Sequence, residues 1–173
     1  MTVNWFCYCG RIPVLIDDGF QVYESCAIAR YLVNKYQGTK NSTILIPSDV
    51  KKAALVEQFL SVESSYYDPA VFKVVNQEVF TKFRGGNPDP EIIKEGREDI
   101  NKVLDVYEKI LEGKDYLTGE FSLADISHYS YTHYAINSGH GDLWDKHPNV
   151  ARWWKKISER KGWQQAVSEI NAK

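Results

Sequence analysis

The sequence is poor in cysteine and has no long apolar run, and each shortage excludes a class of protein. Its three cysteines, Cys7, Cys9 and Cys26, are an odd number and make a poor disulfide framework, which favours a reducing compartment. The apolar runs, such as residues 53–56, are far shorter than the roughly 20 residues that a membrane-spanning helix needs. We therefore expect neither a disulfide-stapled secreted protein nor a membrane span.

Neither sign of charge dominates the sequence. It has 21 Lys and Arg against 23 Asp and Glu, and they are interspersed, so no basic stripe is available for nucleic acid or an anionic membrane. Residues 1–6 lack the basic and apolar regions of a secretory signal. The sequence thus predicts a globular cytoplasmic protein that binds neither nucleic acid nor membrane.

Metal-ligand patterns are also weak. Cys7 and Cys9 provide two ligands, which fall short of a tetrahedral site, and no partner cluster accompanies them. His128 and His133 lie five residues apart on one predicted helix and so point in different directions. We expect no metal site.

The first part of the chain predicts a β-hairpin followed by a helix. Two β-rich runs, 12–16 and 20–23, flank residues 17–19, a turn signal that supplies positive φ angles. From Glu24 the pattern becomes helical, and the helix ends at Gly38. Its predicted apolar face is formed by Ala27, Ile28, Tyr31 and Leu32.

The rest of the chain predicts helices alone. A polar segment, 39–49, reads as a linker that ends with a helix N-cap at Asp49. Pro69 should kink or interrupt the first helix, and Ser122 with Asp125 forms a capping box whose role is folding. The predicted helices span roughly 50–83, 91–111, 123–137 and 149–160, with a short piece from Trp163.

One place has the chemistry of a ligand site. Pro13 opens the first strand and cannot complete a ladder pair, so the strand either lies at an edge or presents backbone to a ligand. Glu24 and Ser25 open a helix, where N–H groups, a hydroxyl and the positive dipole end can bind a carboxylate. Glu24 adds an acceptor for an ammonium group. These groups suit a short charged peptide, although an ordinary helix cap is the alternative.

Residues 10–15, the turn at 18–19 and residues 23–32 resemble the glutathione-binding half of glutathione transferases, most closely the phi class. Residues 122–125 and 147–154 resemble the family's helical domain. The implied fold class is α+β in two domains. A partial thioredoxin-like, glutathione-binding domain would span 1–42, and an all-α C-terminal bundle would span 48–173.

The resemblance implies a role for particular residues. Glutathione would be bound by Arg11, Ile12, Pro13, Glu24 and Ser25. An apolar co-substrate would be contacted by Tyr66, Tyr67 and Phe72, with Phe80 nearby, although aromatic residues at helical spacing are often core.

The resemblance begins at Gly10, whereas family members start with a further strand, helix and strand that carry the catalytic residue. Residues 1–9 do not resemble these elements, so we expect an N-terminally truncated relative and assign no residue the catalytic role. The strand at Val14 should then be an unpaired edge. Cys9 and Cys26 replace residues that are common at the family's dimer contacts.

The predicted function is conjugation of glutathione to hydrophobic electrophiles, as in detoxification, by a homodimer that uses glutathione as co-substrate and no cofactor. The alternative is a non-catalytic ligand-binding or assembly module with the same fold, which the missing catalytic helix favours. A thiol-dependent redox protein that uses its own cysteines is a third reading.

Overall fold

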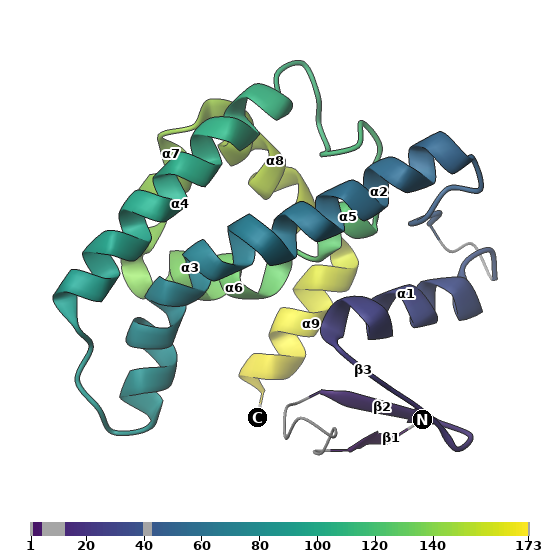
Figure 1. Cartoon of the computed structure of the whole chain (residues 1–173), viewed down its shortest axis with the longest axis horizontal. Helices are drawn as coiled ribbons and strands as arrows, with labels where there is room; N and C mark the ends of the chain where they lie inside the picture. The colour runs from purple at the N-terminus through teal and green to yellow at the C-terminus, as the bar shows by residue number, and fades with distance from the viewer. Residues whose placement is uncertain (1, 5–12, 40–42, 173) are drawn as a thin grey trace. The chain divides into compact units, whose positions relative to one another are not determined.

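The computed structural model describes residues 2–4, 13–39 and 43–172. The chain divides into two compact units, Met1–Ala54 and Leu55–Lys173, and each is described by itself. Figure 1 labels their helices and strands. The first unit contains a small sheet and a helix, and the second is helical.

The predicted hairpin is confirmed. Strand β2 (Val14–Asp17) pairs antiparallel with β3 (Phe20–Tyr23), and Val14 lies opposite Tyr23. The turn residues Asp18 and Gly19 both have positive φ angles, 48° and 85°. Two consecutive positive φ angles give the turn whose twist matches that of the flanking strands.

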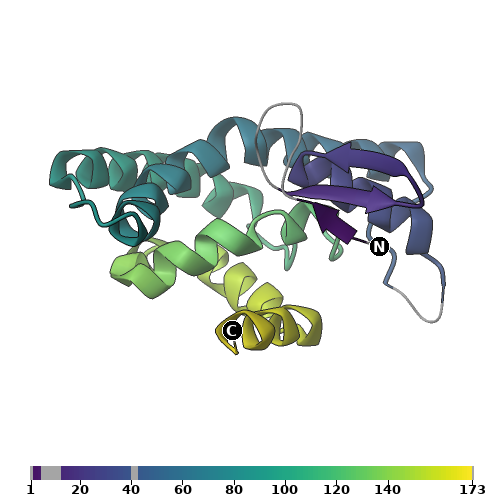
Figure 2. The ribbon, with the colours of Figure 1, turned by 90° about the horizontal axis from the view of Figure 1, so that it is seen from below.

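The prediction that the Val14 strand is an unpaired edge was wrong. A further strand, β1 (Thr2–Asn4), pairs antiparallel with β2, and the order β1-β2-β3 places β2 in the centre. Figure 2 shows the three strands as neighbouring arrows. Ladder pairing uses backbone groups, so a segment can complete a sheet without resembling the family's own strand.

Helix α1 (Ser25–Tyr36) follows β3 and ends before Gly38, whose φ is 83°, as predicted. Its predicted apolar face is half-buried. The Gln37 side chain holds the chain beyond the helix: its Oε1 accepts the N–H groups of Leu45 and Ile46 at 2.7 and 2.8 Å. Asp49 then caps the next helix by accepting the N–H of Lys52 at 2.9 Å, which confirms the predicted N-cap.

The first long helical segment is interrupted at the proline, as predicted. Helix α2 (Val50–Val62) passes through a π-helical turn, η1 (Glu63–Tyr67), into α3 (Asp68–Val75). Pro69 has no N–H to donate and its ring crowds the preceding turn, and a wider π turn accommodates both effects. A second π turn, η2 (Asn76–Thr81), follows α3.

The remaining helices differ from the prediction where one expected helix is split and where a short helix, α7 (Asp142–Asp145), was not predicted. The single helix expected over 123–137 is split, because α5 ends at Ile126 and α6 begins at Tyr129. The Ala124 carbonyl accepts hydrogen bonds from the side chains of Ser127 and His128. These bonds compete with the backbone hydrogen bond that would continue the helix. The other elements are α4 (Pro90–Ile110), α5 (Leu123–Ile126), α6 (Tyr129–Ala135), η3 (Ile136–His140), α7 (Asp142–Asp145), α8 (Pro148–Ser158) and α9 (Lys161–Asn171).

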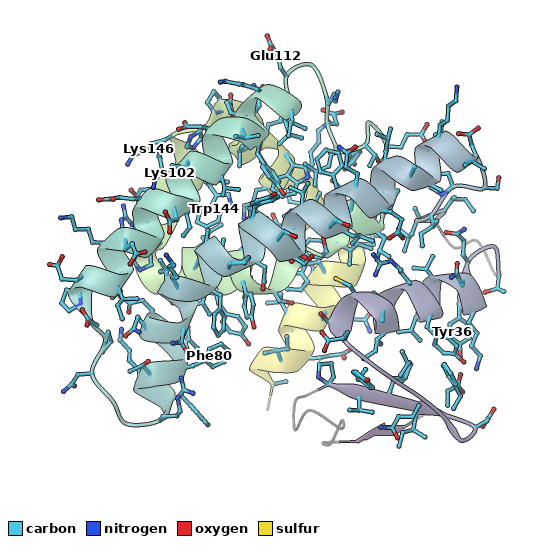
Figure 3. All side chains as sticks on the ribbon, viewed as in Figure 1. Tyr36, Phe80, Lys102, Glu112, Trp144 and Lys146 are labelled. Atoms are coloured by element: carbon cyan, nitrogen blue, oxygen red, sulfur yellow. The ribbon has the colours of Figure 1, made fainter. Side chains whose placement is uncertain are left out.

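The core of the second unit lies where α3 and α4 pack together. Gly96 of α4 allows close approach, because a Cβ there would lie 2.9 Å from Cγ2 of Val74. The capping box at Ser122 and Asp125 is present as predicted. The core also buries Trp144, labelled in Figure 3, and Trp153, which are 1% and 0% exposed.

Candidate functional site

Two residues of the predicted glutathione site, Glu24 and Ser25, lie where β3 enters α1. Tyr23 ends the strand and Ser25 begins the helix, so Glu24 alone makes the connection. Its φ and ψ are 69° and 121°, a conformation that residues with side chains rarely adopt. Such strain costs of order 1–3 kcal/mol and is found mainly at functional sites, where the surrounding structure imposes it.

The chemistry at this junction is that of an anion site with a carboxylate beside it. The Glu24 carbonyl accepts the N–H of Ile28 at 2.9 Å, which begins the helix. The side chains of Glu24 and Ser25 are exposed, and at a helix start the first N–H groups have no acceptor within the helix. In the part of the chain that the structure describes, Glu24 makes no side-chain cap. The missing hydrogen bond argues against the alternative that Glu24 is an ordinary helix cap.

One other predicted glutathione contact, Pro13, lies at the start of β2. Pro13 is exposed and immediately precedes the strand. Arg11 and Ile12 lie outside the described residues. The structure therefore places Pro13, Glu24 and Ser25 in the first unit, on the segments that flank β2 and β3.

The three residues predicted for the co-substrate differ in exposure. Tyr66 and Phe72 are 66% and 38% exposed, whereas Tyr67 is 2% exposed. The Tyr67 hydroxyl lies 2.6 Å from Oγ1 of Thr132 and accepts Nε1–H of Trp144 at 3.2 Å. Burial raises the pKa of Tyr67. Tyr67 is thus a core residue, while Tyr66 and Phe72 offer surface to a ligand.

Phe72 belongs to an aromatic cluster from three helical elements. Its ring centroid lies 5.3 Å from that of Tyr131 on α6 and 6.2 Å from that of Phe80 on η2, a residue labelled in Figure 3. Tyr131 was not predicted from the sequence, because no local pattern connects residue 131 with the helix of Phe72. The cluster is an apolar, partly exposed surface suited to planar or aliphatic groups.

A buried carboxyl lies one turn from Tyr66 and was also missed. Glu63 is 7% exposed at the start of η1. Burial, together with the nearby Asp68 carboxylate, raises the pKa of Glu63 to about 8. At neutral pH this side chain is therefore mostly protonated. This pKa shift could not be predicted from the sequence, because it depends on how deeply Glu63 is buried in the folded protein.

His128 is a core residue whose two ring nitrogens both have partners within the protein. Its Nδ1 donates to the Ala124 carbonyl at 2.7 Å, and its Nε2 lies 3.0 Å from the Tyr107 hydroxyl. Burial lowers the pKa of His128 to about 4. Across residues 13–39 and 43–172, no group of three or more His, Cys, Asp or Glu side chains is arranged to hold a metal ion. Among the same residues, no helix has the length and apolar character needed to cross a bilayer.

Comparison with known proteins identifies the family. The model of the glutathione S-transferase N-terminal domain matches residues 3–34, and that of the C-terminal domain matches residues 62–161. Glutathione S-transferase F10 of Arabidopsis thaliana is 37% identical over 166 residues, which are 95% of this chain and 74% of the relative.

Solved structures agree with these matches. Glutathione transferase F7 from Populus trichocarpa has a TM-score of 0.88 at 36% identity, covering 92% of this chain and 75% of that one. Glutathione S-transferase I from maize, solved with an atrazine glutathione conjugate, has a TM-score of 0.84 at 31% identity, covering 92% and 74%.

A small sheet domain followed by a helical domain is the fold that this chain shares with these structures. The chain belongs to the glutathione S-transferase family, and its relatives include plant phi-class members.

Proposed function

We propose that this chain binds glutathione at the β3–α1 junction and conjugates it to an apolar electrophile. The observation that carries the proposal is the strained backbone of Glu24 directly before the exposed Ser25 at a helix start. The γ-glutamyl carboxylate of glutathione would bind the helix end and the Ser25 hydroxyl. Its ammonium group would bind the Glu24 carboxylate.

The remaining glutathione contacts are proposed from the resemblance. Ile12, the residue before Pro13 in the sequence, would pair the backbone of the cysteinyl residue, and Arg11 would face the glycyl carboxylate. A peptide that pairs with backbone and has charges bound at both ends is fixed in one orientation, so that its sulfur occupies one place.

The co-substrate would lie on the aromatic surface formed by Phe72, Phe80 and Tyr131, and the exposed Tyr66 would also contact it. The ring contacts of Phe72 and the exposure of Tyr66 support this assignment. In the conjugation step, the glutathione sulfur bonds to the electrophilic carbon, the leaving group departs with its electron pair, and the thiol proton passes to solvent. We assign activation of the thiol to no residue of this chain.

The proposal includes a cytoplasmic homodimer in which glutathione is a co-substrate, with a glutathione-binding domain over 1–42 and a helical domain over 48–173. The family supports the assembly and the location. The compact units Met1–Ala54 and Leu55–Lys173 support a division into two domains.

The test combines retention on immobilised glutathione with conjugation of a general aryl halide. Glu24→Ala and Ser25→Ala should each lose retention. Glu112→Ala, which removes an exposed carboxylate from the other unit, should be retained like the parent. Retention with turnover supports the transferase, and retention without turnover supports the non-catalytic binder. A folded chain that is not retained contradicts both.

A further inference from the structure

One buried carboxylate joins the sheet of the first unit to its helix. Asp17, the last residue of β2, is 8% exposed. It accepts a hydrogen bond from the Tyr31 hydroxyl at 2.5 Å and forms a hydrogen-bonded ion pair with the Lys35 ammonium group. Both partners lie on α1, so the three side chains tie the β2–β3 turn to the helix.

The spacing of Tyr31 and Lys35 allows Asp17 to restrain the position of α1. Tyr31 and Lys35 are four residues apart and so lie on the same face of α1, one turn above the other. One carboxylate that contacts two successive turns opposes both rotation of the helix about its axis and sliding along it. The ring of Tyr31 also packs on that of Phe20, with centroids 5.2 Å apart.

The charges of this cluster persist through neutral pH. The hydrogen bond from Lys35, with that from Tyr31, lowers the pKa of Asp17. The same carboxylate raises the pKa values of Lys35 and Tyr31, mainly through those hydrogen bonds. All three shifts favour the observed protonation states, so the cluster does not open near pH 7.

The connection between β3 and α1 makes the orientation of the helix matter for the ligand. Glu24 is the only residue between them, so no loop can absorb a rotation of α1. Any such rotation must change the φ and ψ angles of Glu24, which already has a φ of 69°. It would also redirect Ser25 and the N–H groups at the helix start. The position of the site therefore depends on what holds the far half of the helix.

We infer that Asp17 is a positioning residue for glutathione, which acts through Tyr31 and Lys35 by fixing the direction of the α1 N-terminus. The inference rests on the proposed function, because it concerns the same site. In the described part of the chain, Asp17 bonds to Tyr31 and Lys35, neither of which belongs to the proposed ligand site. Its effect is on the affinity for glutathione and not on the chemical step.

The test compares two neighbouring substitutions that remove the same charge. Asp17→Asn breaks the ion pair, whereas Asp18→Asn changes an exposed turn residue whose φ of 48° suits asparagine. Two quantities are measured in the folded proteins at 25 °C: the dissociation constant for glutathione, and the amide exchange rate of Ile28, which bonds to the Glu24 carbonyl.

For Asp17→Asn we expect the dissociation constant to rise roughly two- to thirtyfold, the range for residues that act on a site without contacting the ligand. The KM for glutathione should rise with it, while kcat at saturating glutathione is kept, and the Ile28 amide should exchange faster. Asp18→Asn should match the parent in every measurement. Lys35→Met should weaken binding too, and adding it to Asp17→Asn should bring little further loss, because both remove one interaction.

The outcomes separate the inference from the proposed function. If the parent binds glutathione and Asp17→Asn binds it equally well, the inference is wrong and the function stands. If the parent does not bind glutathione, the proposed function fails, and the Ile28 exchange rate still decides whether Asp17 orders the helix start. Equal rates in the parent and Asp17→Asn overturn the inference in that case.

Discussion

The indole Nε1–H of Trp153 donates to Oδ1 of Asp125 at 2.9 Å in the core of the helical unit. The same carboxylate accepts the N–H groups of Leu117 at 3.1 Å and Ser122 at 2.9 Å. The residue that completes the capping box of α5 thus also attaches α8 and the preceding loop. Burial raises the pKa of Asp125, and these hydrogen bonds oppose that shift. Asp125 therefore connects the start of α5, the loop before it and α8.

Asp125→Ala should therefore destabilise the protein by about 3 kcal/mol, because it leaves several buried donors without an acceptor at once. Trp153→Phe removes one of these hydrogen bonds and keeps most of the ring, so it should destabilise the protein less than Asp125→Ala does. Urea unfolding followed by circular dichroism would measure both. A loss for Asp125→Ala below that of a single exposed cap, about 1 kcal/mol, would contradict the shared role.

His128 should make stability depend on pH. Its pKa is lowered to about 4 by burial, whereas an unfolded histidine titrates near 6.5. Above pH 6.5 both states are neutral and the residue has no effect. Below it the unfolded chain takes up the proton first, so stability falls as the pH falls toward 4.

Between pH 7.5 and 5 this difference amounts to about 2 kcal/mol of unfolding free energy. Urea unfolding of the parent and of His128→Gln at the two pH values isolates it, because the other titrating groups are shared. The same pH dependence in both proteins would show that His128 is not the group responsible.

Gly96→Ala should destabilise the helical unit, although alanine is the better helix former by about 1 kcal/mol. The added Cβ would lie 2.9 Å from Cγ2 of Val74 and 3.0 Å from Cβ of Lys73, closer than these atoms can approach. We expect a net loss of about 1–3 kcal/mol. Gly162→Ala on α9 is the control, because nothing lies within 4 Å of its added Cβ. That variant should keep or raise the melting temperature.

The aromatic surface around Phe72 should govern the co-substrate and not glutathione. Phe72→Ala and Tyr131→Ala remove rings that contact each other at 5.3 Å, and each should raise the KM for an aryl halide about tenfold. Phe83→Ala is the control, since that ring is 89% exposed. An unchanged KM in both ring variants, measured at saturating glutathione, would place the co-substrate elsewhere.

Local signals in the sequence located most elements correctly. The hairpin was predicted because residues 17–19 contain the turn chemistry, and α1 because its apolar spacing changes at Glu24. The caps at Asp49 and Ser122 were found because a cap needs only residues within one turn. Pro69 interrupted its helix for an equally local reason.

Several misses concern residues that are far apart along the chain, whereas the break between α5 and α6 arises from side chains within four residues of Ala124. The pairing of β1 with β2 was not foreseen, because strand pairing leaves no mark in a segment as short as Thr2–Asn4. Tyr66 and Tyr67 are adjacent and chemically alike, yet one is exposed and the other lies against Thr132. Which of two neighbours faces the core depends on the π turn that contains them.

The sequence by itself determined where the chain turns, where most helices begin and which residues have the chemistry to bind glutathione, since these depend on a few neighbouring residues. Only the tertiary structure decided that Glu24 is held with a positive φ, that Asp17 reaches two turns of α1 and that Tyr131 joins Phe72. Those relationships depend on distance and burial, which packing sets between residues that are far apart along the chain.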